Sequence, residues 1–132
     1  MDCVFCKIVK GDIPCHNIYE EDDFIAFLDI NPCNPGHTLI IPKKHYRWVW
    51  DVENAGDYFE AAKKVAKALQ KSLEAEFVVS GIGGTDVPHA HIHIIPRFKD
   101  DGHGSWLNPE KTLKLPNDEM EKISEKIRKS FK

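Results

Sequence analysis

Histidines alternate with apolar residues near position 90, in the order His89, Ala90, His91, Ile92, His93 and Ile94. Alternate side chains of a β-strand share a face, so this spacing predicts a strand with three imidazoles on one side and core residues on the other. Neutral imidazole can act as nucleophile, base, acid or metal ligand near neutral pH. The run predicts a functional row of histidines, and the simpler alternative is a set of solvated histidines on an edge strand.

Strand geometry limits what this row can do. Neighbouring side chains on one face lie roughly 7 Å apart and the outer two roughly 13 Å apart, which is too far for all three imidazoles to bind one metal ion. We therefore expect different roles for His89, His91 and His93.

Length and composition exclude several classes of protein. The 132 residues are 42% hydrophobic, which predicts one domain with a real core. A formal charge of −3 gives no basic field for nucleic acid. No apolar run is long enough to span a membrane, and the start at Met1 is too abrupt for a signal peptide. We expect a cytoplasmic protein.

Four cysteines fit a reducing compartment, because Cys15 and Cys33 are isolated and show no disulfide framework. Cys3 and Cys6 form a Cys-x-x-Cys pair with three interpretations: metal ligands, a redox dithiol, or ordinary small residues near a terminus. A redox dithiol normally follows a strand, and only two residues precede Cys3. A metal would need two more ligands, which histidines could supply.

The pattern of elements predicts an α+β fold. The expected elements are a short helical segment at 3–10, a hairpin of strands 17–20 and 24–29, a strand at 38–42, a helix at 54–74, a strand at 77–79 antiparallel to the histidine strand, and a last helix capped by Asn117. The first long helix carries an apolar stripe that we interpret as core: Phe59, Ala62, Val65, Ala66, Leu69 and Leu73. Residues 99–115 read as a long loop that covers the site, packs on a partner or is mobile. His16 and His103 have no partner visible in the sequence and are expected to be solvated.

Glycines 81, 83 and 84 precede the histidine run. Backbone N–H groups of such a loop can approach an oxyanion closely, which would suit phosphate at Gly84, although a plain turn explains the same glycines. Beside three imidazoles, the anion interpretation points to attack on phosphorus.

The segment 89–95 is similar to the His-x-His-x-His-x-x signature of the histidine-triad (HIT) superfamily of nucleotide hydrolases and transferases. The resemblance covers residues 1–98 and is closest to the branch of purine nucleoside phosphoramidases and bacterial and archaeal HIT hydrolases. The matching segments are 3–9, 11–14, 26–32 and 36–45.

The resemblance implies a single HIT-like domain over residues 1–132, with 99–132 as loop and helix. It implies an antiparallel sheet of about five strands, two main helices and a two-fold homodimer. It makes His91 the nucleophile toward an α-phosphorus and His93 the group that contacts the phosphate and leaving group. His37 is expected to border the phosphate site, as in some relatives.

The resemblance also implies a purine pocket built from Phe5, Ile8, Phe27 and Ile30, with Asp29 accepting hydrogen bonds from ribose hydroxyls. Core packing is the plain interpretation of Phe5 and Phe27. In many members a structural zinc is bound at the positions of Cys3, Cys6, His45 and His89.

Two positions at the expected phosphate site depart from close relatives. Ser80 stands where asparagine is common, and Asp86 stands where serine or threonine is common. A carboxylate at Asp86 would repel phosphate unless it is turned away, protonated or paired with a cation.

We expect a nucleotide hydrolase or nucleotidyl transferase that cleaves a P–N or P–O bond of an AMP-type purine nucleotide through a nucleotidyl-histidine intermediate. The alternative is a zinc-stabilised nucleotide-binding module with little turnover. A third interpretation, metal handling by the histidine row, requires an ion at His91 and His93.

Overall fold

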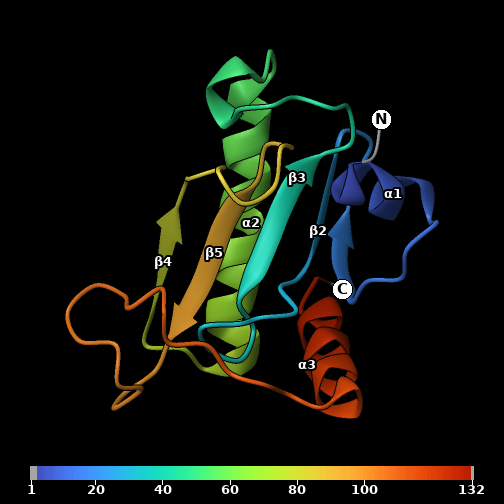
Figure 1. Ribbon diagram of the computed structural model, residues 1–132. Coiled ribbons are helices and arrows are strands. Elements are labelled where there is room, and N and C mark those ends of the chain that lie inside the picture. The colour runs from blue at the N-terminus through green and yellow to red at the C-terminus, as the bar shows by residue number, and fades with distance from the viewer. Residues whose placement is uncertain (1–2, 132) are drawn as a thin grey trace.

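A five-stranded antiparallel sheet forms the centre of the protein, in the order β1-β2-β3-β5-β4 (Figure 1). It is seen in a computed structural model that describes residues 3–131 and leaves Met1, Asp2 and Lys132 undescribed. The strands are β1 Asn17–Glu20, β2 Phe24–Leu28, β3 Thr38–Pro42, β4 Phe77–Gly81 and β5 Ile92–Arg97. The expected α+β fold with about five antiparallel strands is confirmed, as is the antiparallel pairing of β4 with β5.

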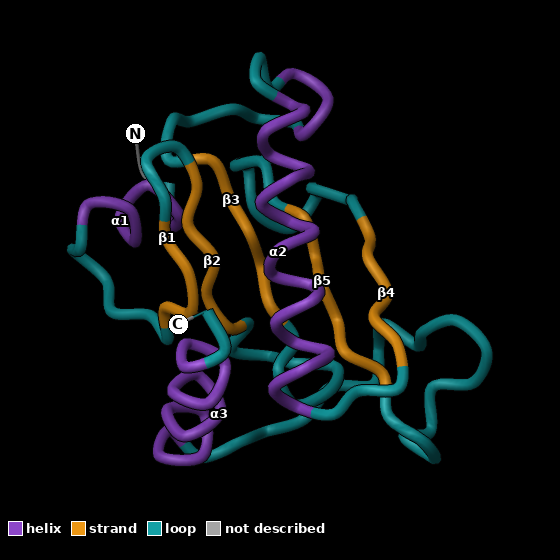
Figure 2. The backbone as a smooth tube through the Cα atoms, turned by 180° about the vertical axis from the view of Figure 1, so that it is seen from behind, coloured by secondary structure: helices purple, strands orange, loops and turns teal. Residues whose placement is uncertain are grey.

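The helices are α1 Val4–Lys10, the 3-10 turn η1 Val49–Asp51, α2 Ala55–Leu73 and α3 Asn117–Lys129. Seen from behind, α2 runs across one face of the sheet, and α3 lies beside it near β1 and β2 (Figure 2). Residues from the sheet and from these two helices form one large apolar core. Within residues 3–131, no helix combines the length and apolar character needed to cross a membrane.

The helix α2 turns a slightly different face to the core from the one we predicted. Val65 and Leu69 are fully buried as expected, but Phe59 is 43% exposed. Tyr58 is fully buried in its place and donates a hydrogen bond from its hydroxyl to the Ile40 carbonyl at 2.6 Å. The hydroxyl explains the error, because a tyrosine can enter a core when its O–H has a partner.

Two predicted element boundaries were wrong. The strand β5 begins at Ile92, so His89 and His91 precede it and lie in the segment that leads from the glycine loop. Asn117 is the first residue of α3, and Pro116 occupies the N-cap position. The side chain of Asn117 instead contacts the ring of His16, which is half-buried against α3 and not solvated.

A buried arginine holds the segment that follows β5. The Arg97 guanidinium contacts the Asp101 carboxylate at 2.8 and 3.1 Å, and it donates to the Gly104 carbonyl at 2.7 Å and to the Trp106 carbonyl. His103 is also buried and lies 2.9 Å from the Cys33 carbonyl, so its expected solvation was wrong. Residues 98–109 are therefore fixed against the end of the sheet.

Candidate functional site

A cavity of about 540 Å³ opens beside β4 and β5. Ile92 and Ile94 of β5 pack in the core with α2, whereas His93 and Ile95, on the opposite face of the strand, line the cavity. Five of the predicted site residues line it: Asp29, Ser80, Gly84, Asp86 and His93. Its other walls come from the β2–β3 connection, the glycine loop and the segment after β5, and they are Asn31, Cys33, His37, Val79, Gly81, Ile82, Gly83, Thr85, Ile95, Trp106, Leu107, Pro109 and Thr112. The loop 99–115 thus contributes part of the cavity wall.

The ring of His91 is oriented by the backbone. Its Nδ1 lies 2.8 Å from the His89 carbonyl oxygen, which can only accept a hydrogen bond. The proton of neutral His91 is therefore on Nδ1, and Nε2 carries a free lone pair. The residue is only 1% exposed, and this Nε2 has no hydrogen-bond partner among the described residues. A lone pair held in this way is a nucleophile or a metal ligand.

The carboxylate of Asp86 lies against this lone pair. One Asp86 oxygen is 3.2 Å from His91 Nε2, without the geometry of a hydrogen bond. The Asp86 side chain is 64% exposed and belongs to a segment without regular structure. Burial raises the pKa of Asp86, but backbone hydrogen bonds and the positive charge that His91 carries when it is protonated outweigh burial and hold this pKa below its ordinary value. Asp86 is therefore ionised at neutral pH.

His37 determines which ring nitrogen of His93 carries the proton. The Cys33 N–H donates to His37 Nδ1 at 3.0 Å, so neutral His37 carries its proton on Nε2. That Nε2 lies 2.9 Å from His93 Nδ1. His93 accepts there and carries its own proton on Nε2, which makes it a neutral donor beside the cavity. The prediction that His37 borders this site agrees with its place in the cavity wall.

Burial keeps both of these rings neutral. It lowers the pKa of His37 to about 3, and repulsion from His93 in its protonated form makes a smaller contribution. Burial also lowers the pKa of His93, and repulsion from His91 in its protonated form acts in the same direction. Asp29 lies 3.5 Å from His37 Nε2, and burial raises the pKa of its carboxyl group.

Gly84 is the position in the loop where only glycine fits. Its φ is +125°, and a Cβ there would lie 3.0 Å from the Trp48 ring. A side chain at this position would therefore be both strained and blocked. The loop carries the chain around the cavity to Asp86.

The predicted base-pocket residues lie at the edge of this site, outside the cavity lining. Phe5 packs edge-on against His91 and Phe27, with ring centroids 5.4 and 5.5 Å apart. Phe5 and Phe27 are buried in a small cluster between α1 and the sheet that also includes Ile8, as the core interpretation expects. Ile30 is 80% exposed. Their role toward a nucleotide stays a prediction.

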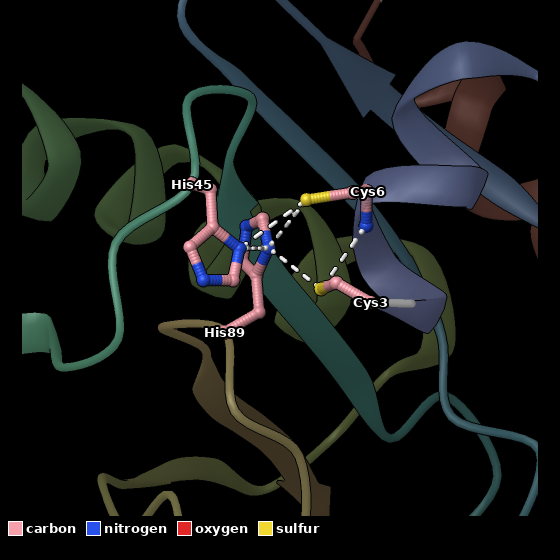
Figure 3. A group of neighbouring side chains, drawn as sticks. All are labelled: Cys3, Cys6, His45 and His89. Atoms are coloured by element: carbon pink, nitrogen blue, oxygen red, sulfur yellow. Dashed lines mark hydrogen bonds between the residues drawn. The ribbon is translucent and has the colours of Figure 1, made fainter. Parts of the chain in front are cut away.

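A second cluster combines Cys3, the N-cap residue of α1, and Cys6 of the same helix with His45 and His89 (Figure 3). The nearest distances are 3.1 Å between the two Nδ1 atoms, 3.2 Å from Cys6 Sγ to His45 Nδ1, and 3.3 Å from Cys3 Sγ to His89 Nδ1. His89 Nε2 donates to the Pro42 carbonyl at 2.8 Å, so the lone pair of His89 is on Nδ1 and faces the thiols. The structure thus brings all four predicted metal ligands together.

One of the three expectations for residues 99–115 was that this loop covers the site, but the sequence did not single out the four loop residues that line the cavity, because nothing local marks the path of a long loop. These residues are Trp106, Leu107, Pro109 and Thr112. Nor did the sequence indicate the contact between Asp86 and His91. For the position of the loop on the cavity wall, Arg97 was the one available signal, because a charged residue in an apolar strand needs a buried partner.

Residues 10–100 match the HIT domain family. An adenosine 5'-monophosphoramidase of Schizosaccharomyces pombe is 39% identical, with 97% of this chain and 100% of the relative covered. The crystal structure of a Hit-like protein involved in cell-cycle regulation from Bartonella henselae has a TM-score of 0.85 and 35% identity, with 98% of this chain and 96% of that chain covered. A zinc-bound histidine triad protein of Mycobacterium smegmatis has a TM-score of 0.79 and 31% identity, with 98% and 93% covered.

Proposed function

Because the chain belongs to the HIT family, we propose that it is a nucleotide hydrolase that cleaves a P–N or P–O bond of an AMP-type nucleotide through His91. The observation that carries this proposal is the 2.8 Å contact from His91 Nδ1 to the His89 carbonyl, which leaves the lone pair of the neutral ring on Nε2. A transferase differs only in the acceptor of the second step.

In the first step, His91 Nε2 attacks the α-phosphorus and forms a P–N bond, while the bond to the leaving group breaks. The His93 Nε2–H donates a hydrogen bond to the departing nitrogen or oxygen, which takes up a proton from solvent as it leaves. In the second step, a water molecule attacks the same phosphorus, loses a proton to solvent and releases AMP from His91. Two displacements through a good nucleophile replace one difficult displacement.

Substrate must displace the Asp86 carboxylate, since that group lies against the attacking nitrogen. Asp86 can turn aside because its side chain is largely exposed and its segment has no regular structure. Ser80 and Gly84 then lie beside the phosphate in the same cavity. This arrangement gives the nucleophile a path to phosphorus.

The purine would pack beside the nucleophile. Phe5 contacts the His91 ring, and Ile8 and Phe27 belong to the same apolar cluster, with Ile30 extending it to the surface. Asp29 supplies a carboxylate that can accept hydrogen bonds from ribose hydroxyls.

The cluster of Cys3, Cys6, His45 and His89 would hold a structural zinc ion. Two thiol sulfurs and the Nδ1 atoms of two imidazoles converge there, and their contacts of 3.1 to 3.5 Å suit a tetrahedral ion. His89 already presents its Nδ1 lone pair to the cluster, because its Nε2 donates to the Pro42 carbonyl. The ion would tie α1 to the segment that presents His91, and it would take no part in the reaction.

The test is release of AMP from adenosine 5'-phosphoramidate. We expect His91→Ala and His91→Gln to abolish release while AMP still binds, and His16→Gln, a control outside the cavity, to behave as wild type. Release that survives in both His91 variants would instead support the nucleotide-binding module with little turnover. The expected homodimer is tested separately by sedimentation.

A further inference from the structure

The Asp86 carboxylate occupies the place that a reacting phosphoryl group would take. Its oxygen is 3.2 Å from His91 Nε2, and reacting atoms in a productive complex lie about 3–3.5 Å apart. A bound substrate must therefore displace this carboxylate. Asp86 is itself one of the residues that line the cavity.

The lining of the cavity carries no fixed cation, and the Arg47 guanidinium lies outside that lining, over the Trp48 ring next to Gly84. Among the residues that line it, Asp29 and Asp86 are acidic and none is lysine or arginine. Its two histidines, His37 and His93, are kept neutral by burial. A group with several negative charges would therefore enter an unfavourable field.

The far wall of the cavity suits an aliphatic group. Trp106, Leu107 and Pro109 form part of it, on the segment that Arg97 fixes against the sheet. Asp86 lies on the glycine loop, so a short carbon chain on this wall could carry a charged end toward it.

Building on the proposed function, we propose that Asp86 is a specificity-determining residue that selects the charge of the leaving group. Substrates whose leaving amine carries a second, free ammonium are favoured, because that ammonium pairs with the displaced carboxylate. Leaving groups that carry carboxylate or polyphosphate are disfavoured by the same charge.

Three adenosine 5'-phosphoramidates of equal chain length test this directly: those of 1,4-diaminobutane, butylamine and 4-aminobutanoate. Diadenosine triphosphate serves as the substrate with a polyphosphate leaving group. No divalent cation is added, because it would neutralise the charge of that group. For the wild type we expect kcat/KM to fall in the order diaminobutane, butylamine, aminobutanoate, with roughly tenfold between the first and the last and the triphosphate slowest.

The isosteric variant Asp86→Asn should bring the three amides to within about twofold of one another, and Asp86→Ser should do the same. Asp22→Asn, which removes an exposed carboxylate outside the cavity, should keep the wild-type order. The proposal would be overturned if the ratios of kcat/KM among the three amides were the same in the wild type and in Asp86→Asn. It would also be overturned if Asp86→Asn lowered kcat/KM by the same factor on all three amides. If no adenylyl substrate releases AMP at all, the proposed function itself fails.

Discussion

His37 Nε2 lies 2.9 Å from His93 Nδ1, and the backbone N–H of Cys33 occupies the other ring nitrogen of His37. The two contacts together place one proton on Nε2 of each ring. His93 can then donate a hydrogen bond from Nε2 without being charged. Its readiness as a hydrogen-bond donor therefore depends on His37, which lies on the far side of its ring.

Removal of His37 should impair the chemical step more than substrate binding. We expect His37→Ala to lower kcat about tenfold or more, with a smaller change in KM, because the proton of His93 is no longer held on Nε2. His37→Gln keeps an N–H donor and should recover part of the loss. Nitrogen NMR of the imidazoles would report the tautomer directly, and a His93 signal unchanged in His37→Ala would contradict this account.

Acid should destabilise the protein through His37. Its pKa is about 3 in the folded protein and ordinarily 6.5, so the unfolded state binds more protons between these values. The free energy of unfolding should fall as pH drops below about 6.5, by up to about 1.4 kcal/mol per pH unit from this group. In urea unfolding, the free energy of unfolding of His37→Gln should fall less steeply with decreasing pH than that of the wild type. Parallel dependences on pH would contradict this role of His37.

Loss of the metal cluster should cost stability. The double variant Cys3→Ser, Cys6→Ser should contain no zinc and should melt on the order of 10 °C lower, because a bound ion stabilises only the folded state. Cys15→Ser is the matched control and should keep zinc and melting temperature. Zinc that persists in the double variant would place the ion elsewhere, for example at His91 and His93.

Arg97 should be needed to hold the cavity wall. Arg97→Met leaves the buried Asp101 carboxylate without its cation, and we expect a loss of about 2–3 kcal/mol in the free energy of unfolding. Proteolysis should then cut between residues 98 and 109. Lys44→Met removes an exposed partner of Glu53 and should change neither property. A protease-resistant Arg97→Met protein would show that other contacts hold the segment.

Much of the fold could be predicted from periodicity, because the apolar pattern of β2, β3 and α2 reflects burial directly. The apolar pattern did not predict which residues with polar groups are buried in the core. Tyr58 is buried through its hydroxyl bond, whereas the more apolar Phe59 is exposed. His103 is buried for the same reason, since the Cys33 carbonyl lies 2.9 Å away.

The site was predictable in its residue types and only partly in its contacts. The spacing of the histidines indicated nucleophilic chemistry, and the resemblance placed Cys3 and Cys6 with His89. The contact of Asp86 with His91 depends on how the glycine loop folds back, which no local signal specifies. For the same reason, the sequence could not show that Trp106 lies on the cavity wall.

The central claim is that His91 Nε2 becomes covalently linked to the nucleotide. Rapid mixing with adenosine 5'-phosphoramidate, an alkaline quench and mass analysis of the peptides should detect AMP on the peptide that contains His91. The adduct should disappear in His91→Gln and should accumulate when His93→Ala slows its hydrolysis. Release of AMP at wild-type rates without an adduct, or with the adduct on another residue, would contradict the account.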